Sequence, residues 1–291
     1  MDTEKFVTSK IPHNCLIKAK SVYETLKSAE RKAVDYIFAA PEAIIGTSIV
    51  TTAGKAGCSE ATLVRLAKKL GYEGYPEMKK DFAAWQNHQP GVVYKGITPQ
   101  DGPLSVVEKV FAASMQSLRD TMNVLDKEEY GKAVSLLVGS KRILIAGLGD
   151  ASEVAASLYQ KFLRIDVDVR TSDDPDIQLV LASHLKPGDV TVAISHSGRT
   201  VTVLNTVKET RRSGAAVIAV TNYPLSPLAK AAAAVLLTAD FSEHFSGEVV
   251  SKRVSELCIV ESLYINYLIQ KNGTLLEALA ASNSAVDVYK C

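Results

Sequence analysis

Short apolar runs dominate the chain from Lys141 onward. They are rich in Val, Ile, Leu and Ala, each is separated from the next by a helical-looking or turn-rich segment, and they fall at residues 142–146, 167–170, 190–194, 217–220 and 234–237. Strands that are apolar throughout belong in a sheet buried on both faces, with helices between parallel strands. The pattern predicts an α/β domain on a five-stranded parallel sheet.

Outside that region the apolar residues recur at helical spacing. The N-terminal part reads as short helices, the first of them after Ser28, and residues 253–271 read as a final helix. A long helix, followed by a shorter one to about Val138, carries near one face Val107, Val110, Phe111, Ser114, Met115, Leu118, Met122 and Leu125. A stripe this apolar must pack against another surface.

A turn-rich stretch separates the two patterns. Residues 89–103 contain three Pro and three Gly, which favour extended or turning chain over helix. We therefore predict an all-helical domain over residues 1–88, a linker over 89–103 and an α/β domain over 104–291. Residues 1–90 hold 13 Lys and Arg against 10 Asp and Glu, whereas residues 91–291 hold 20 against 22, so only the small domain is basic.

Composition excludes several classes of protein. The 291 residues suit two domains of roughly 150 residues each. A net charge of +1 argues against a histone-like cation or an acidic tail. Three of the first five residues are charged (Asp2, Glu4 and Lys5), and no apolar run approaches the ~20 residues of a membrane helix, so we expect a cytoplasmic protein without membrane contact. The four cysteines and five histidines are scattered, so we expect no disulfide framework, metal or other cofactor.

Residues 48–70 have the pattern of a helix-turn-helix. A short helix to Ala56 is followed by a turn at Gly57-Cys58-Ser59 and a second helix to Leu70, in which Gly57 can adopt the left-handed backbone and Ser59 can cap the second helix. One side of that helix is apolar, and the polar side next to it can enter a major groove. The candidate DNA contacts are Ser59, Thr62, Arg65, Lys68 and Lys69.

A solvated face on an ordinary helix pair is the alternative, because charge runs usually are just that. The turn favours DNA, as does a local excess of six Lys and Arg over three Asp and Glu between Lys55 and Lys80. Arg65 is the best candidate for a base edge, whereas Lys69 is expected to contact phosphate.

Two loops rich in small and hydroxyl residues follow the first and third predicted strands. They are residues 147–152 (GLGDAS) and 195–200 (SHSGRT), and both open helices, whose free amides and dipole favour an anion. In a flavodoxin-like strand order 2-1-3-4-5 the two loops flank the switch point of the sheet and line one pocket. The candidate ligands of a phosphate monoester are Gly147, Gly149, Ser152, Ser195, Ser197, Gly198 and Thr200.

Two alternatives remain open for these loops. Gly147-x-Gly149 also begins a dinucleotide fingerprint, with Asp168 at the right distance for a ribose, but position 152 is Ser rather than Gly and the fingerprint does not explain the second loop. The glycines and hydroxyls could also simply form tight turns and caps. That interpretation explains one serine but not three hydroxyl residues in one loop.

Residues 59–65 (SEATLVR) through 71–75 (GYEGY), together with 194–200 (ISHSGRT), resemble the RpiR family of bacterial transcriptional regulators, and the resemblance spans nearly the whole chain. It implies a helix-turn-helix domain that binds double-stranded operator DNA and a SIS (sugar isomerase) domain that binds a phosphosugar effector without turning it over. It implies further that Ser195, Ser197 and Thr200 hold the phosphate, and that the chain forms a homodimer or homotetramer.

The sequence departs from the family pattern at two places. The first loop usually carries its serine at the position of Ala151, so either Ser152 substitutes for it or the loop contributes only backbone amides. The first helix of the turn motif normally has Leu where Thr52 stands, and Gly54 in that helix costs about 1 kcal/mol relative to Ala.

A phosphosugar isomerase on the same sheet is the second functional hypothesis. It would need a positioned base and a proton shuttle, for which the candidates are Glu248, His196, His244 and Lys252. We prefer packing or surface roles for these residues, because an isomerase would leave the helix-turn-helix without a purpose.

Overall fold

The computed structural model describes residues 18–19, 22–39, 44, 46–88, 97–240, 252–271 and 275–289, and divides them into two units after Val124. The long helix that precedes the division is thereby grouped with the N-terminal helices. The domain bounds of 88 and 104 stay a prediction. Each unit is described by itself.

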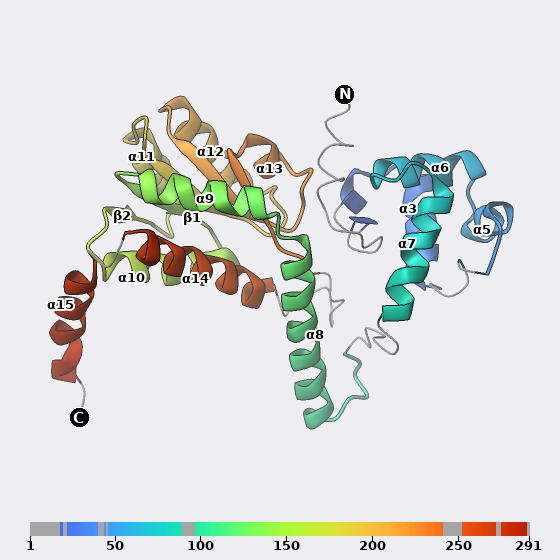
Figure 1. Ribbon diagram of the computed structural model, residues 1–291, viewed down its shortest axis with the longest axis horizontal. Helices are drawn as coiled ribbons and strands as arrows, with labels where there is room; N and C mark the ends of the chain where they lie inside the picture. The colour runs from blue at the N-terminus through green and yellow to red at the C-terminus, as the bar shows by residue number, and fades with distance from the viewer. Residues whose placement is uncertain are drawn as a thin grey trace. The chain divides into compact units, whose positions relative to one another are not determined.

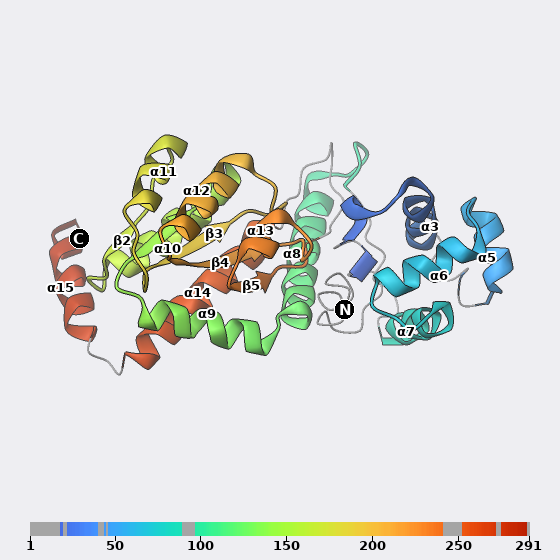
Figure 2. The ribbon, with the colours of Figure 1, turned by 90° about the horizontal axis from the view of Figure 1, so that it is seen from above.

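The N-terminal unit is helical, as expected (Figures 1 and 2). Its elements are η1 (Tyr23–Thr25), α3 (Ser28–Ala39), α5 (Ile49–Ala56), α6 (Glu60–Lys69), α7 (Tyr75–His88) and α8 (Pro103–Val124). Helix α3 packs against α5 and α6, and α6 packs against α7. The core between them is formed by Val34, Ile37, Leu63, Leu66, Leu70, Met78 and Phe82, which are all buried.

The second unit is a parallel sheet between two layers of helices (Figure 2). Its elements are α9 (Lys127–Gly139), β1 (Ile143–Ala146), α10 (Asp150–Leu163), β2 (Val169–Arg170), α11 (Pro175–Ser183), β3 (Val190–Ile194), α12 (Val201–Arg212), β4 (Ala216–Thr221), α13 (Pro227–Ala231), β5 (Ala234–Leu237), α14 (Lys252–Gln270), α15 (Leu276–Val286) and η3 (Asp287–Tyr289). The strand order is β2-β1-β3-β4-β5 with every pair parallel, which confirms the predicted order.

Strand β2 is shorter than the predicted residues 167–170. The turn that follows α10 extends to Val167, because the Val167 amide donates to the Phe162 carbonyl (3.2 Å). Asp166 in this turn has a positive φ of 58°. The strand pairing with β1 is therefore limited to Val169 and Arg170, preceded by one hydrogen bond from the Ile143 amide to the Asp168 carbonyl (2.9 Å).

The two faces of the sheet carry side chains of different size because alternate residues of a strand point to opposite faces. In β3, Val190, Val192 and Ile194 face the layer of α9, α10 and α14, whereas Ala193 faces α12 and α13. The larger cluster therefore lies under α9, α10 and α14. Strand β1 ends at Ala146 and β3 at Ile194, and the two candidate loops begin there.

Candidate functional sites

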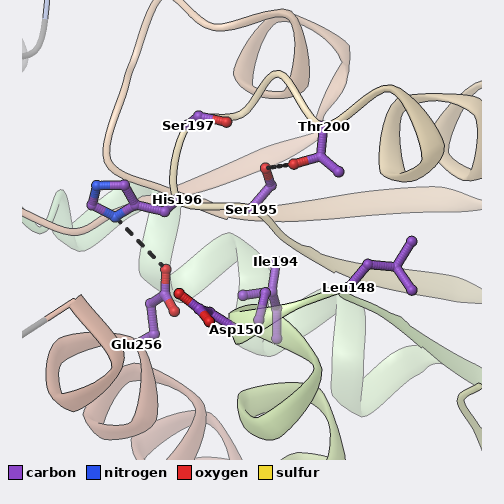
Figure 3. A pocket seen from close by; sticks show the side chains of 9 residues that line it. Leu148, Asp150, Ile194, Ser195, His196, Ser197, Thr200 and Glu256 are labelled. Atoms are coloured by element: carbon purple, nitrogen blue, oxygen red, sulfur yellow. Dashed lines mark hydrogen bonds and ion pairs between the residues drawn. The ribbon is translucent and has the colours of Figure 1, made fainter. Parts of the chain in front are cut away.

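A cavity of about 250 Å³ lies at the carboxyl ends of β1 and β3 (Figure 3). Three segments line it: the β1–α10 loop, the β3–α12 loop and the first turns of α14. The lining residues are Leu148, Asp150, Ala151, Ile194, Ser195, His196, Ser197, Thr200 and Glu256. The structure thus brings the two predicted loops to one pocket at the switch point of the sheet.

The β3–α12 loop directs hydrogen-bonding groups into this cavity. Ser195 Oγ lies 3.0 Å from Thr200 Oγ1, and the Arg199 amide donates to Ser197 Oγ (3.2 Å). Thr200 is the N-cap of α12 but its side chain caps no amide, and within the described residues no acceptor is seen for the first-turn amides of residues 201–203. A helix N-terminus with free amides and two hydroxyls beside it is a binding site for an oxyanion.

Gly198 is required for the shape of this loop. Its φ is +61°, and a Cβ atom there would overlap the Ser226 hydroxyl and lie 2.9 Å from Thr221 Oγ1. The loop is held from both sides, since the Gly198 amide donates to the Ser195 carbonyl (2.9 Å) and the Gly198 carbonyl accepts from the Leu228 amide (3.1 Å). The β4–α13 segment therefore holds this turn in its conformation.

The β1–α10 loop is equally tight but contributes other groups than expected. A Cβ on Gly147 would lie 2.8 Å from the Ala151 carbonyl oxygen, and Gly149 has φ +59°. Helix α10 begins so soon after β1 that Leu148, Asp150 and Ala151 reach the cavity. Ser152 is not among the lining residues, and its amide donates to the Gly149 carbonyl (2.9 Å). In this structure the loop offers backbone and a carboxylate in place of a serine.

Glu256 and His196 line the cavity on the side away from Thr200 (Figure 3). Glu256 is 1% exposed, and its Oε1 lies 4.0 Å from His196 Nδ1. The His196 ring also meets the Tyr223 ring edge to face, with 6.0 Å between centroids. The sequence analysis missed Glu256, although it shares a helical face with the buried Val260 and Leu263, where a charged residue is a signal for a site.

The sequence names four candidate residues for an isomerase. Glu248 and His244 lie outside the described residues, as does the side chain of Lys252. His196 is described and lies in the cavity.

Asp168 lies at the wrong edge of the sheet for a dinucleotide site. Its carbonyl accepts from the Ile143 amide (2.9 Å), at the amino end of β1, whereas the glycine loop follows the carboxyl end. Its carboxylate is paired with Arg142 (2.7 Å) and Arg170 (3.2 Å). The pairing gives Asp168 a structural role.

The helix-turn-helix has the predicted local structure. Gly57 ends α5 with φ 63°, and Ser59 caps α6 by accepting from the Thr62 amide (3.2 Å). Thr52, which replaces the leucine of the family pattern, is fully buried; its hydroxyl lies 2.9 Å from Thr47 Oγ1 and accepts from the Tyr75 hydroxyl (3.0 Å). The hydroxyl introduced into this core is therefore satisfied.

The five candidate DNA contacts differ in exposure. Ser59, Arg65 and Lys68 are exposed on α6, whereas Thr62 is only 3% exposed. Thr62 Oγ1 accepts from Arg65 Nη2 (3.3 Å), so Thr62 orients the arginine. Lys69 is drawn back to α3, where its ammonium lies 2.9 Å from the buried carboxylate of Glu30. This ion pair ties α6 to α3.

Replacement of Lys69 by Met should destabilise the N-terminal unit by about 1–3 kcal/mol, because it leaves Glu30 buried without its cation. Burial raises the pKa of Glu30, but hydrogen bonds from the Lys27 amide and from Lys69 outweigh it and hold the pKa below its ordinary value. The carboxylate therefore stabilises the fold above the pKa of an unfolded glutamate, and this contribution is lost as the pH falls through the lowered value.

Denaturant unfolding followed by the fluorescence of Trp85, the single tryptophan, measures this effect. The difference between the wild type and Lys69→Met should shrink as the pH falls below about 4. Lys68→Met is the matched control and should change stability by less than about 0.5 kcal/mol. Equal stability of the two variants at neutral pH would contradict the assignment.

Two further features, a metal-binding cluster and a membrane-spanning helix, are absent from the described residues. Among them no group of three His, Cys, Asp or Glu side chains could hold a metal ion. No helix within the same ranges is both long and apolar enough to cross a membrane.

Comparison with known proteins matches two segments of the chain to known protein families. The helix-turn-helix domain of the rpiR family matches residues 13–86, and the SIS domain matches residues 136–265. The regulator HexR of Escherichia coli is 31% identical over 94% of this chain and 94% of its own length. An uncharacterized HTH-type transcriptional regulator of Thermotoga maritima is 30% identical over 94% of this chain and 98% of its own.

A solved structure shares the fold. It is the Vibrio vulnificus NanR protein complexed with ManNAc-6P, which is 22% identical, covers 96% of this chain and 100% of its own, and superposes with a TM-score of 0.60. Together with the HexR match over nearly the full length, the two domain matches place the chain in the RpiR family of HTH-type transcriptional regulators.

Proposed function

We propose that this protein is a transcriptional regulator whose α6 reads double-stranded operator DNA and whose cavity binds a phosphosugar that controls this reading. The observation that carries the proposal is the meeting of two loops, with free helix amides and hydroxyls, in one cavity of a chain that also has a helix-turn-helix. The V. vulnificus NanR complex with ManNAc-6P supports the choice of ligand class.

The distribution of charge in the cavity gives the ligand an orientation. Asp150 and Glu256 lie on the side away from Ser197 and Thr200 (Figure 3). Carboxylates repel a phosphate dianion, so the phosphate belongs at the Ser195–Thr200 loop, with the Gly198 turn beside it. Carboxylates accept hydrogen bonds from hydroxyl or amino groups, so the sugar belongs between Glu256, His196 and the loop that contains Gly147, Gly149 and Ala151.

On the DNA side, Arg65 and Lys68 are the exposed cations of α6. We assign Arg65 to a base edge, Lys68 to backbone phosphate, and Ser59 to the phosphate beside the N-terminus of α6. Thr62 positions Arg65, and Lys69 serves the fold instead of a phosphate. We further propose a two-fold homodimer, or a tetramer built from such dimers, which would read a palindromic operator.

A screen of hexose, pentose and amino-sugar phosphates tests the proposal. A cognate ligand should raise the melting temperature and change operator affinity by roughly 5- to 150-fold, because coupling between two sites is typically 1 to 3 kcal/mol. The matching free sugars are the controls and should act far more weakly. Ser197→Ala should blunt the response while leaving operator binding by the ligand-free protein unchanged. A full panel without any shift in melting or in operator binding would overturn the sensor.

Phosphosugar isomerisation is the second candidate, because Glu256 and His196 are acid–base groups in the same cavity. We prefer a binding role for them, since the chain belongs to a family of regulators. Exchange of solvent deuterium into the cognate phosphosugar, followed by NMR, decides between the two. Turnover that disappears with Glu256→Gln would establish an enzyme.

A further inference from the structure

Helix α8 exposes the apolar stripe that the sequence analysis expected to be packed. At 100° per residue an arc of about 80° holds Leu104, Val107, Phe111, Met115, Leu118 and Met122. Among these, the large exposed residues are Leu104 (71%), Val107 (50%), Phe111 (66%), Met115 (51%) and Met122 (79%), and Leu118 lies among them. The opposite side of α8 holds the buried polar residues Gln116, Ser117, Asp120 and Thr121. The helix therefore has its apolar side outward.

We propose that this stripe is covered by α8 of a second copy of the chain, lying antiparallel, with the two-fold axis crossing the stripe at the level of Ala113 along the helix. Two pairs of the apolar residues are symmetric about that level. Phe111 and Met115 each lie two residues from Ala113, and Leu104 and Met122 each lie nine residues from it. In an isologous contact residue i meets j while j meets i, so Phe111 would pack on the partner's Met115, and Leu104 on the partner's Met122.

The charges beside the stripe favour the same arrangement. Glu108 and Arg119 are exposed on one flank of the stripe, five residues before and six residues after Ala113, and neither has an ion pair within the described part of the chain. Antiparallel pairing brings each Glu108 to the partner's Arg119, which makes two ion pairs across the axis. In a parallel pair the two Glu108 side chains would lie at the same level along the helices, and so would the two Arg119 side chains. Lys109, by contrast, is already occupied by Asp101 (2.6 Å).

The area of the stripe suits a second copy. At roughly 150–250 Å² for a large side chain, the five exposed residues offer on the order of 500 Å² per copy. Two copies would bury roughly 1,000 Å², which reaches the lower range of specific interfaces. The stripe runs for about 27 Å along the helix, so two helices can meet along most of their length.

The mass of the full-length protein in solution, measured by light scattering after gel filtration, is the first test. The wild type should have the mass of two chains or of an even multiple, and Phe111→Glu should weaken self-association at least about 100-fold. Val180→Glu is the matched control, since Val180 is also half-exposed (49%) but lies on α11. A monomeric wild type, or a Phe111→Glu protein that still pairs like the wild type, would overturn the proposal.

Charge reversal tests the antiparallel register. Glu108 and Arg119 are both exposed, so the variants should still fold. Glu108→Arg alone and Arg119→Glu alone should each weaken the pair about tenfold, because each puts two like-charge contacts across the axis. The double variant Glu108→Arg/Arg119→Glu should recover wild-type association. Failure of the double variant to recover would exclude this register. Neither result depends on the phosphosugar or the operator, so the pairing and the proposed function can fail separately.

Discussion

Gly198→Ala is expected to abolish the response to the cognate phosphosugar and to lower stability by about 1–3 kcal/mol. The backbone at Gly198 has φ +61°, and an added Cβ would overlap Ser226, which is itself 1% exposed and cannot withdraw. The loop must therefore shift, and the hydrogen-bond donors around Ser195, Ser197 and Thr200 no longer point to one position. Each lost charge-assisted hydrogen bond removes about 1.5–3 kcal/mol, so effector affinity should fall ~100-fold or more.

Gly188→Ala is the control that separates backbone strain from loop displacement. Gly188 also has a positive φ, +93°, but nothing lies within 4 Å of an added Cβ, and it lies before β3, outside the two loops that line the cavity. It should lose some stability while its effector titration, followed by calorimetry, matches the wild type. An unchanged effector affinity in a folded Gly198→Ala protein would refute the assignment of the phosphate to this loop.

Arg65→Ala should remove specific operator binding while the fold and the phosphosugar response remain. Arg65 is exposed and its only hydrogen bond seen in the described region is the one to Thr62, so the core loses nothing. A good arginine contact to a base is worth about 1–3 kcal/mol. A dimer loses two such contacts, so operator affinity should fall by ~100-fold or more.

Fluorescence anisotropy with operator and scrambled duplexes at several salt concentrations measures this effect. Lys32→Ala, which removes an exposed cation from α3, is the control and should leave the ratio between the two duplexes unchanged. Lys68→Ala should weaken both duplexes alike and reduce the salt slope by about one. If Arg65→Ala kept the wild-type preference for the operator, α6 would not be the recognition helix.

The sheet and its loops could be predicted from the sequence because their signals are local. An apolar run such as 190–194 followed by hydroxyl residues specifies a buried strand and a loop at its end, and the strand order then brings the two loops together. Glu256 could not be placed in this way, since it reaches the cavity from α14, about 60 residues further along the chain. Only the packing of α14 shows that its carboxylate faces His196.

The recognition helix shows the same limit at the level of single side chains. A helical wheel places Thr62, Arg65 and Lys69 on one side, but it contains no information about α3. The buried Glu30 draws Lys69 toward the fold, and the hydrogen bond with Arg65 occupies Thr62. For α8 the wheel gave the stripe correctly, but no single-chain pattern can say that its cover is absent from the described part of the chain.

The ion pair between Lys69 and Glu30 has an evolutionary consequence. On α6 the cation that ties the helix to α3, Lys69, is distinct from the cations that point outward, Arg65 and Lys68. Duplicated copies of such a gene can therefore drift toward new promoter sequences by changing outward positions alone, without a loss of folding that selection would have to repair.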